Sequence, residues 1–434
     1  MFDDITPIRP DWDKPNYDES AVAPFTLEDP LCFADGTPLR SRDDWPRRRA
    51  EILGIFAREM YGVEPPAPES LVTELFDEKQ DALGGFAIRS QYRMWFRADK
   101  TGPCVNWLVF RPRYVKKPVP VILFLNYHGN FELVPDPDIP IMEKWCLAGD
   151  NSTSPDGQVL EAIRGRMCNP NNRYFFPIGT IIARGYAVMS ACYCEISPDP
   201  SYTETNPAHR QTPFAYTGVF DLWGRRDETR DDNTTALGAW AWALSRGLDL
   251  AKTIPGIDAA RSIVTGCSRL GKAALLAAAR DTRFAVAVPN QCGGGGACLA
   301  KRDYGECVGT EVAMFTHWYC KAYAKYAKNP ARTLTFDQHL LLAAIAPRPL
   351  LIEGFDTSPW MDTYGEYLAC RAASPAWEFL GLPGMPGDAY PENYSREAIG
   401  PYLGYVRRNE AHGLAICDWM WMLDFADRAF GFRD

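Results

Sequence analysis

Buried strands alternate with helices over residues 118–430, and this alternation constrains the fold more than any other feature of the chain. The run PVPVILFLN, which starts at residue 118, is apolar throughout, as is typical of a strand buried on both faces of a parallel sheet. Similar runs recur at AVMSACY, SIVT, FAVAVPN and PLLIEGF, with helical segments such as ALGAWAWALSRGLDLAKT between them. The pattern predicts a doubly wound α/β fold with its ligand chemistry at the carboxyl ends of the strands.

The remaining segments surround this core. Residues 1–45 are rich in Pro and Asp and predict an extended N-terminal arm, followed by an amphipathic helix that ends at Gly62. FAIRSQYRMWFRA and VNWLVFRP predict antiparallel strands ahead of the parallel ones. Residues 131–175 and 191–234 lack periodicity and predict long loops over the active-site face. We expect one domain spanning residues 1–434.

Composition excludes several classes of protein. A net charge of −9 without a basic stripe argues against a nucleic-acid partner. No apolar stretch reaches the roughly 18 residues that a membrane span needs. The 13 cysteines are scattered and lack zinc-site spacing, so we expect free thiols, no metal and no cofactor. We also expect a monomer.

The N-terminus bears on location. It is acidic and proline-rich, without the basic start and apolar core of a signal peptide. The sequence therefore favours either a cytoplasmic protein or a secreted one whose leader has been removed.

A candidate nucleophile stands where a buried strand meets an alanine-rich helix. The segment from Gly266 to Gly271 reads GCSRLG and approximates the G-x-S-x-G elbow of α/β hydrolases, which would expose Ser268 at the top of the sheet. The match is imperfect, because the second glycine comes one residue late. The alternative is an ordinary helix N-cap serine.

A serine nucleophile needs a base to take its proton. Of the five histidines, His128 and His209 precede the serine, against the order Ser, acid, His of α/β hydrolases. His317 and His339 lie in segments with helical patterns and read as structural. His412, in a loop beside a glycine just before the last helix, is the predicted base.

Two further positions have open interpretations. Asp356 follows the strand PLLIEGF, where the triad acid is expected, although FDTSP also suits a simple turn. His128 and Gly129 follow the first buried strand, and they suit either a backbone oxyanion loop or a turn.

Several motifs together resemble one family. GCSRLGKAAL, GGGGACLAKRDYGECV, a tryptophan after the strand that precedes Asp356, and HGLAICDW resemble the glucuronoyl esterases, carbohydrate esterases with an α/β-hydrolase fold. The likeness runs from about Pro30 to the C-terminus. It implies a three-layer αβα sandwich around a mostly parallel sheet, and cleavage of esters between (4-O-methyl-)glucuronic acid branches of xylan and lignin alcohols.

The resemblance also implies roles for individual residues. Ser268 would attack the C6 carbonyl, and Arg269 would donate to the developing oxyanion. Lys272 and Glu306 would hydrogen-bond sugar hydroxyls, and Trp360 would lie against the same sugar. Taken without the resemblance, Lys272 and Glu306 read as solvated surface charges.

One position departs from the family pattern. Many members carry the triad glutamate just before the glycine cluster, where this chain reads PNQCGGGG and has Gln291. Other members place the acid after the later strand, where Asp356 stands. The sequence thus predicts a serine esterase acting on uronate esters, with a histidine-like pKa of roughly 6 to 7 in its pH profile. The alternatives are an esterase for acetyl or feruloyl sugars and a non-catalytic carbohydrate-binding relative.

Overall fold

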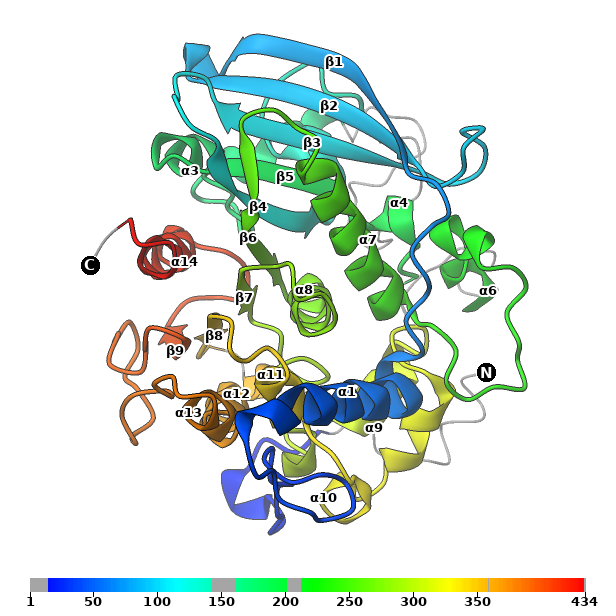
Figure 1. Ribbon diagram of the computed structural model, residues 1–434, viewed down its shortest axis with the longest axis vertical. Helices are drawn as coiled ribbons and strands as arrows, with labels where there is room; N and C mark the ends of the chain where they lie inside the picture. The colour runs from blue at the N-terminus through cyan, green and yellow to red at the C-terminus, as the bar shows by residue number, and fades with distance from the viewer. Residues whose placement is uncertain (1–14, 143–160, 201–211, 358, 433–434) are drawn as a thin grey trace.

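The computed structural model describes residues 15–142, 161–200, 212–357 and 359–432. Among them, nine strands form one sheet in the order β1-β2-β3-β5-β4-β6-β7-β8-β9 (Figure 1). The strands are β1 (Val72–Ala82), β2 (Ala87–Trp95), β3 (Cys104–Pro112), β4 (Val119–Asn126), β5 (Ala187–Cys192), β6 (Ile257–Cys267), β7 (Val286–Asn290), β8 (Leu350–Phe355) and β9 (Leu403–Arg408).

The pairing of the strands confirms the predicted fold class. β1, β2, β3 and β5 pair antiparallel, whereas all pairs from β5 across to β9 are parallel. Every residue of β4, β5, β7 and β8 is buried, because helices cover both faces of this part of the sheet.

Helices complete the outer two layers. α3 and α14 pack on one face of the sheet, and α7 and α8 pack on the other (Figure 1). The described α-helices are α1 (Trp45–Phe56), α3 (Ile178–Ala183), α4 (Tyr193–Ile196), α6 (Thr212–Ala215), α7 (Ala236–Ala251), α8 (Arg269–Arg280), α9 (Val308–Met314), α10 (Pro330–Thr333), α11 (Gln338–Ala343), α12 (Thr363–Ala373), α13 (Pro375–Phe379) and α14 (Ile416–Ala429). The predicted three-layer αβα sandwich is therefore confirmed.

Helix α8 explains the alanine-rich run of the sequence. It packs against α7 and against strands β6 and β7, and Ala273, Ala274 and Ala277 are almost fully buried there. Small side chains let the helix approach its neighbours closely at the packing density of a protein interior. The helix is thus held rigidly, and so is the turn that leads into it.

Three features differ from the sequence-based expectation. The sequence pattern predicts no strand at β1 or β9, yet both extend the sheet. β1 is half exposed and rich in charge, and β9 ends in two arginines that are buried only because distant carboxylates pair with them. His317 lies between α9 and a 3₁₀ turn and not on a helix.

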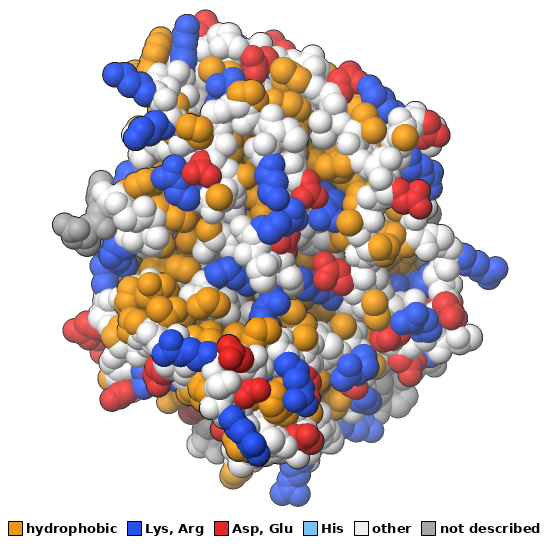
Figure 2. Space-filling model, in the orientation of Figure 1, with side chains coloured by type: hydrophobic (Ala, Val, Ile, Leu, Met, Phe, Trp, Pro, Cys, Tyr) orange, Lys and Arg blue, Asp and Glu red, His pale blue; other side chains and the backbone are white. Residues whose placement is uncertain are grey.

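The described residues also bear on the compositional expectations. Most of their 12 cysteines are buried. Within these residues, no helix combines the length and the apolar character that a membrane crossing requires. Acidic and basic side chains are intermingled on the face shown in Figure 2.

Candidate active site

Ser268 occupies the strained turn that the sequence predicts. Its backbone has φ 58° and ψ −129°, and it joins the end of β6 to the start of α8. A Cβ on Gly266 would lie 2.3 Å from the Leu270 carbonyl oxygen, and one on Gly271 would lie 2.7 Å from that of Asn290. The turn therefore requires glycine at both positions, and the late second glycine serves the contact with β7.

Neighbouring groups hold this turn in place. The Ser268 N–H donates to the Asn290 carbonyl at 3.0 Å, and the Tyr127 hydroxyl donates to the Cys267 carbonyl at 2.6 Å. A non-glycine residue in such a conformation costs about 1–3 kcal/mol and persists only where its surroundings impose it. Strain of this kind is concentrated at functional sites.

The His412 loop lies against the serine turn. The Cys267 thiol lies 3.6 Å from the Gly413 carbonyl oxygen, so the residues adjoining Ser268 and His412 are in contact. The His412 ring centroid is 5.4 Å from that of Trp360, which lines the same pocket as Ser268. The predicted nucleophile and base thus belong to one site.

The His412 ring is buried among positive charges. Its Nδ1 is 2.6 Å from an Arg173 nitrogen and 3.4 Å from the Tyr174 hydroxyl, and Arg173 Nε also donates to the His412 carbonyl at 2.8 Å. Burial and, in decreasing order of importance, the positive charges of Arg173, Arg269 and Lys272 together lower the pKa of His412 to about 3. The imidazole is neutral at physiological pH.

The contact with Arg173 determines which ring nitrogen carries the proton. A guanidinium only donates, so Nδ1 accepts and the neutral ring has its proton on Nε2. That Nε2 is buried and has no hydrogen-bond partner among the described residues. General-base catalysis needs the lone pair on Nε2. For His412 to act as a base through Nε2, Arg173 would have to release Nδ1, and the adjacent Tyr174 hydroxyl could then accept an Nδ1 proton.

Among the described residues, no hydrogen bond or ion pair joins Asp356 to His412. Its carboxylate pairs with Arg407 and accepts from Asn393 at 3.3 Å, and its side chain is 37% exposed. The geometry therefore gives no support to Asp356 as the triad acid. It sits where the sequence places it, directly after β8, but the side chain is committed to β9 and to the loop before it.

Arg269 is held by a buried carboxylate that the sequence did not point to. Asp199 pairs with Arg269 at 2.5 Å and also accepts from His317 at 2.6 Å and Trp318 at 2.8 Å. Burial would raise the pKa of Asp199, but Arg269 and His317 outweigh it and hold that pKa well below its usual range. The Nε of Arg269 is buried and has no partner in the described part of the chain.

Lys272 and Glu306 form an ion pair and are not separate surface charges. Lys272 Nζ is 3.0 Å from Glu306 and 3.4 Å from Glu311, and only 1% of the lysine side chain is exposed. Burial disfavours the charge, yet the two carboxylates raise the pKa of Lys272 above its usual value. The pair therefore places a buried positive charge against Glu306, which lines the same pocket as Ser268.

A pocket of about 520 Å³ connects these residues, a size suited to a small ligand. Its lining residues are Pro15, Tyr17, Ser268, Arg269, Gly305, Glu306, Thr310, Met314, Phe315, Trp318 and Trp360. The N-terminal arm supplies Pro15 and Tyr17, and it is tied down by the Gly305 N–H, which donates to the Asn16 carbonyl at 2.8 Å. The site thus draws on segments far apart in the sequence.

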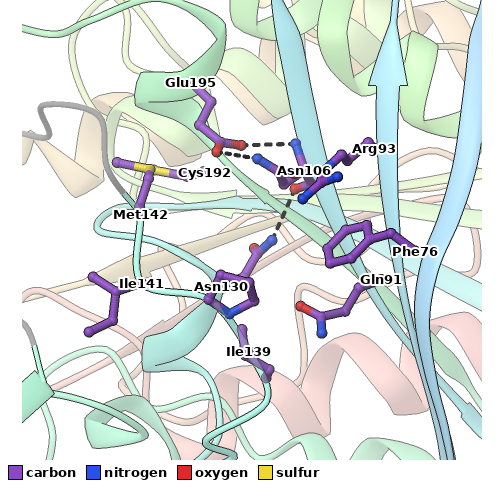
Figure 3. A pocket seen from close by; sticks show the side chains of 11 residues that line it. Phe76, Gln91, Arg93, Asn106, Asn130, Ile139, Ile141, Met142, Cys192 and Glu195 are labelled. Carbon is purple, nitrogen blue, oxygen red and sulfur yellow. Dashed lines mark hydrogen bonds between the residues drawn. The ribbon is translucent and has the colours of Figure 1, made fainter.

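Other polar features lie outside this pocket. A cavity of about 250 Å³ is lined by residues such as Gln91, Asn106 and Glu195 and by none of the predicted site residues (Figure 3). The Gly129 N–H donates to Asn126 at 2.9 Å, which favours the turn interpretation of that segment over an oxyanion loop. Within the described ranges, no group of His, Cys, Asp and Glu is arranged to hold a metal ion.

Several residues at the site were not identifiable from sequence. Arg173 and Asp199 lie in the described parts of the two long loops predicted to cover the active-site face. Asp199 had one available signal, since it follows soon after the carboxyl end of a buried strand, where α/β sheets place ligand-binding groups. Arg173 and Tyr17 lie in segments without periodicity, so no pattern marks them.

Comparison with known proteins supplies the context for this geometry. A family model described as "Glucuronyl esterase, fungi" matches residues 202–381. A carbohydrate esterase from an unknown prokaryotic organism is 34% identical, covering 95% of this chain and 91% of its own. The 4-O-methyl-glucuronoyl methylesterase 1 of Wolfiporia cocos is 33% identical over 85% of this chain and 76% of its own. The structure of a glucuronoyl esterase from Solibacter usitatus superimposes with a TM-score of 0.85 at 32% identity, covering 95% of this chain and all of that one.

Proposed function

Because the chain belongs to the glucuronoyl esterase family and is a carboxylic ester hydrolase acting on uronic esters, we propose that Ser268 is its nucleophile and His412 its base. The observation that carries this assignment is the strained serine at the wall of a pocket that also contains Arg269, Glu306 and Trp360. The preferred substrates are esters of glucuronic or 4-O-methylglucuronic acid with lignin alcohols. We propose a monomer as the working unit.

The proposed reaction follows the acyl-enzyme route. Ser268 Oγ attacks the C6 carbonyl carbon while His412 Nε2 takes its proton, and a tetrahedral intermediate forms. The imidazolium then protonates the leaving alcohol, and a water activated by the same ring hydrolyses the acyl-enzyme. The positive charge of Arg269, anchored by Asp199, stabilises the oxyanion, and its orientation costs nothing at the moment of reaction.

Recognition of the sugar rests on other residues of the pocket. Glu306 lines it, and Lys272 pairs with Glu306, so a donor and an acceptor for sugar hydroxyls are held at fixed separation. Trp360 and Tyr17 add aromatic faces to the walls. A buried charged pair binds hydroxyl groups without needing to reorganise, which favours a sugar over an apolar acyl group.

The substrate preference is testable with Lys272→Met. The wild type should hydrolyse benzyl glucuronate with a much higher kcat/KM than an aryl acetate. The variant should lose about 100-fold on the glucuronate, in line with loss of hydrogen bonds to a charged group, and change little on the acetate. Lys325→Met, which breaks an exposed ion pair with Glu59, is the control and should match the wild type. Equal losses on both substrates would contradict a sugar-binding role for Lys272.

The pH dependence is testable through Arg173. The base form of His412 exists above its pKa, which is lowered to about 3, so the acid limb of kcat/KM should lie well below pH 6.5. This revises the limb at roughly 6 to 7 that the unperturbed histidine predicts. Arg173→Met removes a nearby positive charge and should move the limb upward, whereas Arg173→Lys keeps the charge and should leave it low. A limb that does not move in Arg173→Met would show that His412 is not the titrating group.

A further inference from the structure

Asn290 and Gln291 connect the serine turn to the histidine loop. The Asn290 carbonyl accepts the Ser268 N–H at 3.0 Å. The next side chain, Gln291, bonds the backbone of Gly413 twice: its Nε2 donates to the carbonyl at 2.7 Å, and its Oε1 accepts from the N–H at 2.9 Å. Gln291 is fully buried, and its own N–H donates to the Glu353 carbonyl at 2.6 Å. Two consecutive residues thus fix both halves of the catalytic pair.

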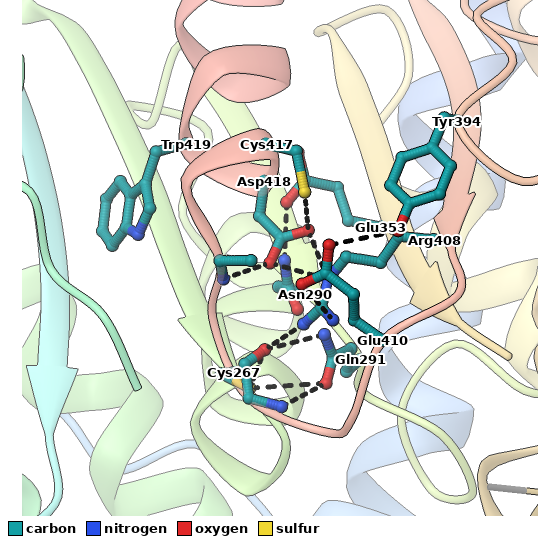
Figure 4. A network of polar contacts seen from close by, with 12 residues as sticks. Cys267, Asn290, Gln291, Glu353, Tyr394, Arg408, Glu410, Cys417, Asp418 and Trp419 are labelled. Atoms are coloured by element: carbon teal, nitrogen blue, oxygen red, sulfur yellow. Dashed lines mark hydrogen bonds and ion pairs between the residues drawn. The ribbon is translucent and has the colours of Figure 1, made fainter. Parts of the chain in front are cut away.

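A buried ion pair also supports this loop (Figure 4). Arg408 donates to the Gly413 carbonyl at 2.8 Å and to the Ala411 carbonyl at 3.0 Å. Asp418 holds the Arg408 guanidinium with oxygens at 2.9 and 3.1 Å from Nε. The residues on either side of His412 are therefore both tied to rigid elements, β9 and α14.

Gln291 does not act on the imidazole itself. Both polar atoms of its side chain are used by Gly413, and the His412 Nδ1 faces Arg173 and Tyr174 instead. We propose that Gln291 is the positioning residue of His412, orienting the base through the Gly413 peptide group and not through a charge at the ring. This proposal rests on the proposed function, because it presupposes that His412 is the base.

The chemistry of the contact requires an amide. A peptide group offers one donor and one acceptor, and a glutamine side chain matches both. A glutamate matches only the N–H, and its second oxygen would face the Gly413 carbonyl oxygen without a proton between them. A glutamate at this position would therefore push the loop away from the serine turn. A methionine would leave the Gly413 N–H unpaired and would remove one of the donors to the Gly413 carbonyl, which keeps its bond from Arg408.

The test compares Gln291→Glu and Gln291→Met on benzyl glucuronate. Both variants should lower kcat by about 10- to 100-fold, as expected for a misplaced catalytic group, with KM within about two-fold of wild type. The acid limb of the pH profile should not move. Gln91→Met is the matched control. Gln91 lies on β2, is also buried, and donates to Asp77 and to the Asp138 carbonyl. This variant should cost similar thermal stability while keeping the wild-type kcat.

Three outcomes would overturn the proposal. A rise in kcat in Gln291→Glu, or an acid limb that moves to higher pH, would show that position 291 is the position of the triad acid and that Gln291 merely lacks the charge. Wild-type kcat in Gln291→Met would show that the contact between Gln291 and Gly413 is dispensable. A loss of kcat no larger than in Gln91→Met would show that Gln291 has a purely structural role.

A second measurement separates this proposal from the proposed function. The rate at which a fluorophosphonate labels the protein requires only an activated serine and not a uronate substrate. If the wild type labels but hydrolyses no uronate ester, the proposed substrate is wrong, whereas the positioning role still predicts about 10- to 100-fold slower labelling of both Gln291 variants. If one Gln291 variant fails to fold, the other variant provides the test. An unchanged labelling rate in that variant would contradict the positioning role of Gln291.

Discussion

Ser268→Ala is expected to lower kcat/KM on a glucuronate ester by about 10⁴- to 10⁶-fold, the range found when serine nucleophiles of triads are removed. The loss follows because the covalent step of the proposed mechanism depends on the Ser268 hydroxyl, while the proposed substrate contacts of Arg269 and of the Lys272–Glu306 pair would remain. KM should consequently change little. Steady-state kinetics on benzyl glucuronate, with the product acid measured directly, provides the comparison.

A matched substitution distinguishes chemistry from folding. Ser268→Gly should be equally inactive but more stable than Ser268→Ala, by about 1 kcal/mol, because glycine adopts a positive φ without strain whereas alanine keeps the Cβ that causes it. Thermal unfolding of the two variants measures the difference. An Ser268→Ala protein that retains wild-type hydrolysis would remove this serine from the mechanism.

His412→Ala is expected to lower kcat/KM by about 10³- to 10⁵-fold, because the serine hydroxyl then has no group to take its proton. The residual rate should come from Arg269 and from substrate binding. Fluorophosphonate labelling of Ser268 should slow to a similar degree, since it depends on the same proton transfer.

His339→Gln is the control for the histidine prediction. His339 is also fully buried, but its Nε2 lies 2.7 Å from the Glu28 carbonyl oxygen, and it lines no part of the pocket. The activity of His339→Gln should stay within about two-fold of wild type. If the two histidine variants lose activity equally, the loss reflects general destabilisation and His412 has no special part.

The core of the fold was accessible from sequence because its signals are local. Runs such as SIVT followed by an alanine-rich helix combine a continuous apolar strand with a helix that must pack closely on both sides, and β6 and α8 lie where these runs predict them. β9 was not accessible, because Arg407 and Arg408 look like solvated charges. They are buried only through pairing with Asp356 and Asp418, a tertiary effect that no local pattern reveals.

The residues of the site likewise fall into those that a local motif predicts and those that no local motif predicts. The serine turn has a local motif, and its structure follows from the glycine at position 266. The partners of its residues come from elsewhere: Asp199 anchors Arg269 from a loop that is irregular in sequence, and Arg173 reaches His412 from another. Asp356 illustrates the limit, since its place after β8 is as expected while its carboxylate binds Arg407. Position along the chain locates a residue on the sheet edge, but it does not determine which charge the side chain meets.

The most direct test of the central claim is peptide mapping by mass spectrometry after reaction with a fluorophosphonate. A hydroxyl on a strained turn at the pocket wall, next to a neutral buried imidazole, should react selectively. We expect one phosphonyl group on Ser268 in the wild type and none in Ser268→Ala. Label on a different residue, or an unlabelled wild type, would contradict the account.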